Sequence, residues 1–146
     1  MKNICSAGKC GAGNLPQLKR EIGLSELKPA QVTIISFNER VISGAKKLLP
    51  DIKAFWLTGF KPHKITQKLV PTKASVFETL AKLKCDGLDC QAHESIDSAF
   101  LKELKAKGYE THCWTVDEAE RASELAEMGM QSITTNRPAF IRKALE

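Results

Sequence analysis

The sequence predicts an α/β protein built from parallel β/α repeats, and two observations support this prediction. Short β-rich runs alternate with longer segments whose apolar residues have helical spacing. The predicted strands begin about every 20 to 35 residues, which suits units of one strand and one crossover helix. Parallel neighbours need long connections of this kind, whereas antiparallel neighbours do not.

The first predicted repeat covers residues 32–50. VTIISF (32–37) is a β-branched, apolar run that is typical of a strand. The segment after it has apolar residues at helical spacing before Pro50 ends the helix; these residues are Val41, Ile42, Ala45, Leu48 and Leu49.

The second repeat has a longer connection. KAFWLTGF (53–60) is a predicted strand, and KPHKITQKLVPT (61–72) is predicted to be a loop because it combines prolines with lysines. SVFETLAKLK (75–84) is a predicted helix, with one apolar face formed by Val76, Phe77, Leu80 and Leu83.

The third repeat begins with GLDCQAH (87–93), a weaker strand pattern. Ser95 is the predicted N-cap of the next helix, because its hydroxyl can accept from the backbone of the first turn. The apolar stripe of this helix consists of Ile96, Phe100, Leu101 and Leu104. Gly108 stands where a left-handed residue is expected to end it.

The fourth repeat begins with YETHCWTV (109–116), which alternates like a strand. Asp117 and Glu120 resemble a capping box, so we expect Asp117 to cap the following helix. Gly129 is expected to end that helix as Gly108 ends the previous one.

The two ends of the chain differ in regularity. MQSITTN (130–136) is a fifth predicted strand, and Pro138 suits the first turn of a C-terminal helix. We expect residues 1–31 to form an irregular segment, with one short helix inside LPQLKREIGLSELK (15–28), and residues 32–146 to form the repeat domain. GKCGAG (8–13) follows no clear strand and lacks the Lys-Ser or Lys-Thr pair of a phosphate loop.

Composition excludes several classes of protein. A chain of 146 residues with 42% hydrophobic and 27% charged side chains suits one globular domain. The net charge is +5, but the lysines are dispersed along predicted helices, so we expect no nucleic-acid partner. There is no signal-peptide pattern and no run that approaches a membrane span.

Cysteine and histidine spacing predicts neither disulfides nor a metal site. The five cysteines are an odd number without a CxxC pair, and the three histidines do not complete a zinc pattern. The residues concerned are Cys5, Cys10, Cys85, Cys90, Cys113, His63, His93 and His112. We therefore expect reduced thiols in a cytoplasmic protein.

Repetition alone leaves two architectures open, an open doubly wound sheet and part of a β/α barrel, and neither GxGxxG nor a P-loop supports the first. Three ordered motifs favour the second. Ser36-Phe37 ends the first repeat's strand, Trp114-Thr115-Val116 ends the fourth, and a Gly-x-x-x-Ile-x-Thr-Asn-x-Pro pattern spans residues 129–138. Together, over residues 32–146, they resemble the C-terminal half of the glycerophosphodiester phosphodiesterase family. The family has asparagine where this chain has Asp117, and aspartate where it has Asn136.

The resemblance implies a TIM barrel, whose chemistry lies at the carboxyl ends of the strands. That rim would include Phe37, Trp56 or Leu57, His93, Trp114 and Asn136. Family members hydrolyse a glycerophosphodiester to glycerol 3-phosphate and an alcohol, with two histidines and a carboxylate-bound Ca²⁺ or Mg²⁺. Their histidine and carboxylate motifs do not occur here. We therefore assign no catalytic residue, no metal ligand and no cofactor to this chain, and expect the cation only in a complete member.

The resulting hypothesis is a partial phosphodiesterase barrel that is inactive by itself. Trp114 and Phe37 would bind the substrate through apolar area, although both would also suit a barrel interior. His93 is the only histidine expected on this rim, and a capping or solvated role is favoured for it over a catalytic one. We expect self-association, or pairing with a missing N-terminal half, because outer strand edges need neighbours. The alternatives are a non-catalytic binding or assembly module and a different phosphate-handling enzyme, which only the dispersed lysines favour.

Overall fold

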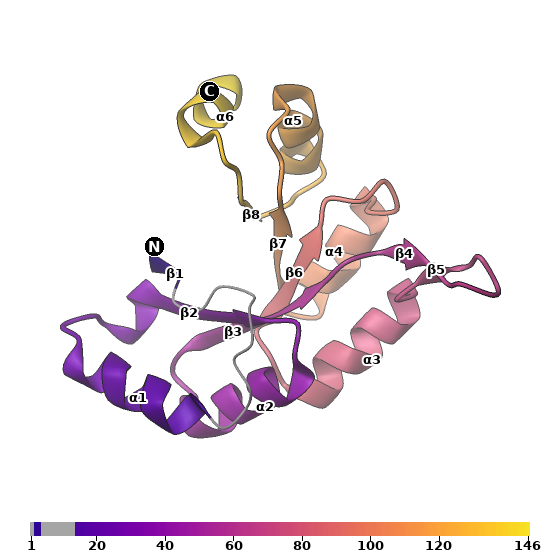
Figure 1. Cartoon of the computed structure of the whole chain (residues 1–146). Coiled ribbons are helices and arrows are strands. Elements are labelled where there is room, and N and C mark those ends of the chain that lie inside the picture. Colours follow the sequence, from indigo (N-terminus) through magenta and orange to yellow (C-terminus); the bar gives the residue numbers. More distant parts are fainter. Residues whose placement is uncertain (1, 4–13) are drawn as a thin grey trace. The chain divides into compact units, whose positions relative to one another are not determined.

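The computed structural model describes residues 2–3 and 14–146 (Figure 1). GKCGAG, Cys5 and Cys10 lie outside the described residues. The chain divides into two compact units, Met1–Leu57 with Glu78–Asp86 and Thr58–Phe77 with Gly87–Glu146. The predicted division after residue 31 stays a prediction.

The first unit contains three parallel strands in the order β1, β2, β3. Its elements are β1 (Lys2–Asn3), α1 (Leu15–Leu24), the 3₁₀ helix η2 (Pro29–Gln31), β2 (Val32–Ser36), α2 (Glu39–Leu48) and most of β3 (Lys53–Thr58), with the last turns of α3 (Lys73–Leu83). Ile34 of β2 is opposite Ala54 of β3. The predicted strands at 32–37 and 53–60 are thereby confirmed, and so is the helix that follows the first of them.

Strand β3 of this unit is buried on both faces, as parallel strands usually are. In β3, the consecutive residues Ala54, Phe55, Trp56 and Leu57 are all buried. Helix α2 begins where the Asn38 side chain accepts from the Arg40 backbone N–H at 2.9 Å. Continuous burial explains why this part of the sequence shows apolar runs instead of alternation.

The ion pair between Lys46 and Asp86 joins separate segments of the first unit. The Lys46 Nζ lies 2.8 Å from Asp86 Oδ2 and also donates to the carbonyls of Pro50 and Ile52. The same Asp86 oxygen accepts from the Ala54 backbone N–H at 2.8 Å. These bonds tie the end of α2 and the start of β3 to the segment before β6.

The second unit also contains three parallel strands, in the order β6, β7, β8. Its elements are β4 (Lys61–Pro62), β5 (Leu69–Val70), the start of α3, β6 (Gly87–Gln91), α4 (Ser98–Ala106), β7 (Glu110–Trp114), α5 (Ala119–Glu127), β8 (Ser132–Ile133) and α6 (Pro138–Ala144). Gly108 (φ +83°) and Gly129 (φ +98°) are left-handed, as predicted. Pro138 lies in the first turn of α6, which also confirms its prediction.

The segment 61–72 is not the simple loop that its composition predicts. β4 and β5 form a short antiparallel hairpin in which Lys61 is opposite Val70 and Pro62 is opposite Leu69. Between them, the His63 N–H donates to the Lys68 carbonyl at 2.8 Å. Proline lacks a backbone N–H, but a strand pair of only two residues at a sheet edge tolerates it. The hairpin therefore forms, and the loop prediction was wrong here.

The N-cap predicted for α4 was also wrong. The helix begins after Asp97, whose carboxylate accepts from the Phe100 N–H at 2.8 Å. Ser95 contacts His93 instead, with its Oγ 2.9 Å from the His93 Nδ1. Ser95 lies inside a turn closed by the Ile96 N–H and the His93 carbonyl, two residues before the cap. No helix in the described part of the chain is long and apolar enough to cross a membrane.

Candidate substrate-binding site

Trp114, the predicted substrate-facing residue, is the last residue of β7 and is half-buried. Its indole Nε1 donates to the Asp89 carbonyl on β6, with an N–O distance of 3.3 Å. Gln91 lies opposite Trp114 in the strand register. The hydrogen bond holds the ring against β6 at the carboxyl end of β7, and a β/α protein places its ligand at the carboxyl ends of its strands.

The two faces of the β6–β7 pair differ in chemistry. Because side chains alternate along a strand, Trp114 shares a face with His112 and Asp89. The other face is fully buried and carries Leu88, Cys90, Thr111 and Cys113. The Trp114 face is defined here as Asp89, Gln91, Glu110, His112 and Trp114. It carries three ionisable groups, with the His112 Nε2 3.7 Å from Glu110 Oε2.

Asp89 is the unusual member of the Trp114 face. It is 6% exposed, and its Oδ1 has no hydrogen-bond partner among the described residues. Burial raises the pKa of Asp89 to about 6, because an ionised carboxylate loses hydration there. Sequence reasoning missed Asp89, since GLDCQAH shows no clear alternation and only the strand register places it beside His112.

Asp117 follows the Trp114 strand but does not cap α5 as predicted. Its carboxylate accepts from the Thr135 hydroxyl at 2.8 Å, the Asn136 N–H at 2.8 Å and the Asn136 Nδ2 at 3.0 Å. The bonds from Asn136 are the main reason that the pKa of Asp117 is lowered. Helix α5 starts after Glu118, which makes no side-chain cap bond. The carboxylate is thus used to join the loop after β7 to the loop after β8.

The same contact joins the two residues at which the sequence departs from the pattern that the resemblance implies. The resemblance places asparagine at position 117 and aspartate at position 136, whereas this chain has Asp117 and Asn136. These two side chains are hydrogen-bonded to each other. Relative to that implied pattern, one carboxylate and one amide are present with their positions exchanged.

Asp117→Ala is expected to lower the melting temperature, because the Thr135 hydroxyl and two donors of Asn136 lose their acceptor. With the pKa of Asp117 lowered in the folded state, its contribution is present above the unfolded pKa and disappears as the pH falls through the folded pKa. Melting curves at pH 7 and pH 3 should show a larger loss at pH 7. The exchanged pair Asp117→Asn with Asn136→Asp should melt close to the wild type; a deficit equal to that of Asp117→Ala would contradict the pairing.

His93 uses its ring nitrogen within its own turn. The Nδ1 accepts from the Ser95 N–H at 3.1 Å, and the ring lies 5.8 Å from the Phe60 ring, between centroids. Arg121 donates to the His93 carbonyl at 3.2 Å. These contacts correspond to the local, capping role that the sequence left open for His93.

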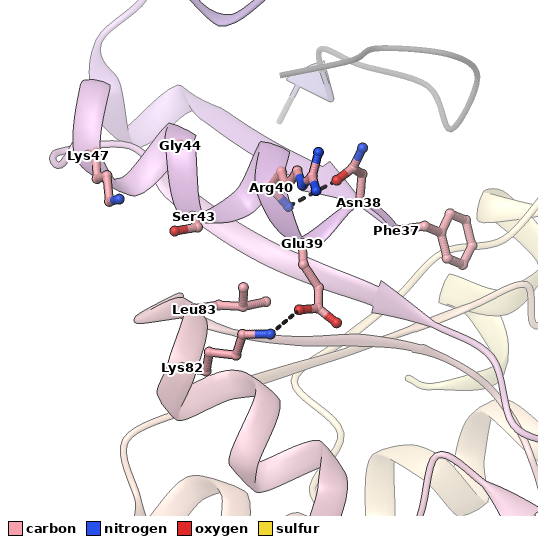
Figure 2. A pocket seen from close by; sticks show the side chains of 9 residues that line it. All are labelled: Phe37, Asn38, Glu39, Arg40, Ser43, Gly44, Lys47, Lys82 and Leu83. Atoms are coloured by element: carbon pink, nitrogen blue, oxygen red, sulfur yellow. Dashed lines mark hydrogen bonds and ion pairs between the residues drawn. The ribbon is translucent and has the colours of Figure 1, made fainter. Parts of the chain in front are cut away.

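Phe37, the other predicted substrate-binding residue, belongs to the first unit, whereas Trp114 belongs to the second. It follows β2 and is 49% exposed. Phe37 borders a cavity of about 860 Å³ whose lining includes Arg40, Lys47 and Lys82. Figure 2 shows Phe37 and Lys47 at opposite ends of this lining, and Lys82 pairs with Glu39 at 2.9 Å.

The described residues do not fit the divalent cation that the family resemblance implies. In residues 2–3 and 14–146, no three His, Cys, Asp or Glu side chains gather in a way that could hold a metal ion. Asp89, Glu110 and His112 share a face but do not form such a group. No step of a reaction is therefore assigned to a metal on these residues.

Comparison with known proteins finds a matching family and similar solved structures. The model of the glycerophosphoryl diester phosphodiesterase family matches residues 9–140, while none of the curated proteins matches. A phosphodiesterase from Oleispira antarctica, solved with the product sn-glycerol-3-phosphate, is similar with a TM-score of 0.68 and 21% identity, over 94% of this chain and 52% of that chain.

Two further solved structures are similar. A Galdieria sulphuraria protein assigned to the glycerophosphodiester phosphodiesterases has a TM-score of 0.75 and 18% identity, over 98% of this chain and 55% of that chain. A glycerophosphodiester phosphodiesterase from Parabacteroides distasonis has a TM-score of 0.65 and 24% identity, over 92% of this chain and 49% of that chain. This chain thus spans about half the length of the solved structures that it matches.

These likenesses confirm the predicted fold class, parallel β/α repeats that correspond to part of a barrel. The family model covers most of the chain, including every strand from β2 to β8. It also includes the three motifs that suggested the resemblance, the last of which ends at Pro138. This chain therefore belongs to the glycerophosphoryl diester phosphodiesterase family.

Proposed function

We propose that this chain provides the substrate-binding half of a glycerophosphodiester phosphodiesterase, an enzyme of glycerophospholipid metabolism that releases glycerol 3-phosphate and an alcohol. The observation that carries the proposal is Trp114, fixed at the carboxyl end of β7 by its bond to the Asp89 carbonyl. The sn-glycerol-3-phosphate in the Oleispira antarctica structure supports the same substrate class. Trp114 would contact the substrate through apolar area. The same kind of contact is proposed separately for Phe37 of the first unit.

Catalysis would need groups that the described residues do not gather. Cleavage of a phosphodiester requires neutralisation of the phosphate charge and a proton donor for the leaving alcohol. The described residues hold no metal-binding group, and the His93 Nδ1 is engaged in its turn. We infer that this chain is inactive alone, and that a further segment or a second polypeptide supplies the histidines and the cation ligands.

This further segment or second polypeptide would also provide strands that pair with the unpaired strand edges. In the described residues, β1 of the first unit pairs only with β2, and β8 of the second unit pairs only with β7. Exposed parallel edges favour association. We propose that the chain self-associates or pairs with the other half of a barrel. Sedimentation velocity at micromolar concentration should show a species larger than 16.1 kDa, and a compact, stable monomer would contradict this.

The activity itself is tested with glycerophosphocholine and Ca²⁺ or Mg²⁺, by coupling released glycerol 3-phosphate to its dehydrogenase. The chain alone should give no product above background, and mixing it with the N-terminal half of a complete family member should give turnover. In the mixture, Trp114→Ala should raise KM roughly tenfold, while Trp114→Phe changes it less. Metal-dependent turnover by the chain alone that His93→Ala abolishes would overturn the proposal.

A non-catalytic binding module is the second candidate, favoured by the missing metal-binding group in the described residues. Isothermal titration of the chain with glycerophosphocholine distinguishes the two. Binding that Trp114→Ala removes, without turnover in any mixture, would favour the module. Turnover in the mixture would favour the phosphodiesterase.

A further inference from the structure

The β4–β5 hairpin carries a basic surface that the proposed function does not use. Residues 61–68 are all exposed, and no aspartate or glutamate occurs between residues 52 and 77. The basic hairpin is defined here as residues 61–70. Its three lysines are Lys61, Lys64 and Lys68, whereas the nearby Lys73 pairs with Asp97. Figure 1 shows the hairpin projecting beyond the start of α3.

The tip of the basic hairpin is held by its own hydrogen bonds. The Gln67 N–H donates to the His63 carbonyl at 2.9 Å, and the Gln67 Nε2 donates to the Lys64 carbonyl at 3.1 Å. The His63 Nδ1 accepts from the Thr66 N–H at 3.3 Å. As a result, Ile65 is presented at the tip, 87% exposed, the highest exposure of any large apolar residue in the described chain.

An aliphatic side chain surrounded by lysines matches the surface of an anionic bilayer. The lysines would meet lipid phosphates and serine carboxylates, while the isoleucine would enter the boundary between headgroups and acyl chains. A single-stranded nucleic acid is less suited, because such sites stack bases on aromatic rings. The aromatic residue next to the hairpin, Phe60, is only 5% exposed.

We propose that the basic hairpin is a peripheral docking element for membranes that contain anionic phospholipid, with Ile65 as the inserted residue and Lys61, Lys64 and Lys68 as the electrostatic contacts. The hairpin lies wholly within the second unit. The proposal is independent of catalysis and of the site at Trp114, so it stands or fails separately from the proposed function.

The test is sedimentation of the full chain with vesicles. Binding is expected to equimolar phosphatidylcholine and phosphatidylserine, and not to phosphatidylcholine alone, and it should weaken with added salt. The triple variant Lys61→Gln, Lys64→Gln, Lys68→Gln should reduce the partition coefficient about 100-fold. Ile65→Ser should reduce it about tenfold, and Ile65→Trp should increase it.

A matched triple variant controls for net charge. Lys19, Lys102 and Lys105 are exposed lysines on α1 and α4, and their change to glutamine removes the same charge. This variant should retain most of the binding, and circular dichroism should show that both triple variants are folded. Equal losses in the two variants would overturn the proposal. So would hairpin variants that weaken binding to a single-stranded oligonucleotide but leave vesicle binding unchanged.

Discussion

Gly87→Ala is expected to lower the free energy of unfolding by about 3 kcal/mol or more, a large part of the stability of a domain of this size. A Cβ at position 87 would lie 2.1 Å from the Glu110 carbonyl oxygen and 2.7 Å from its nitrogen. Gly87 and Glu110 are opposite each other in the β6–β7 register. Because the obstacle is backbone, the strands would have to separate where they pair.

Urea denaturation and the yield of soluble protein measure this effect, and Gly23→Ala is the matched control. Gly23 lies in α1, and a Cβ there would meet no atom within 4 Å. Alanine is the better helix former, so this variant should be unchanged or more stable by up to about 1 kcal/mol. A Gly87→Ala protein as stable as the wild type would show that the register of β6 and β7 is wrong.

Asp89→Asn is expected to stabilise the protein at neutral pH, by up to about 3 kcal/mol. The pKa of Asp89 is raised from 3.8 to about 6 by burial. The folded state therefore holds the proton more tightly than the unfolded state. Stability falls as the pH rises from about 4 to about 6 and stays lower above that range. An amide cannot ionise, so the variant avoids the cost of a buried charge.

Melting curves at pH 4 and pH 7.5 test the prediction for Asp89. The variant and the wild type should differ little at pH 4, and the variant should melt higher at pH 7.5. Asp51→Asn is the control, because Asp51 is exposed and its substitution should change stability by less than about 0.5 kcal/mol at either pH. A variant that is less stable at pH 7.5 would mean that the Asp89 carboxylate has a favourable partner in the folded protein.

The cost of Asp89 also bears on the site. The carboxylate shares a face with Trp114, and its backbone carbonyl holds the indole. Functional sites often keep groups that reduce stability, because their chemistry is needed there. If Asp89→Asn is more stable, the KM of this variant is measured in the mixture with an N-terminal half. A raised KM would show that the carboxylate supports substrate binding although it lowers stability.

The longer strands, the helices and the glycines that end two of the helices could be predicted because local patterns determine them. A β-branched run such as VTIISF favours a strand, and Gly108 and Gly129 adopt left-handed conformations that other residues rarely adopt. Trp114 could be placed at a strand end by its position between an alternating segment and a helix start. The family resemblance rested on three such local motifs, and the family model confirmed it.

Other features depended on residues that are distant in the sequence, so only the tertiary structure decided them. Asp117 has the local pattern of a cap, but Thr135 and Asn136 lie within reach after β8 is paired, and they bind its carboxylate instead. Asp89 becomes a buried carboxylate only through the register of β6 against β7. The sequence by itself therefore determined the elements and the family, because propensity and spacing act over one or two turns. The tertiary structure decided the partners of the polar groups, because strand register brings those groups together.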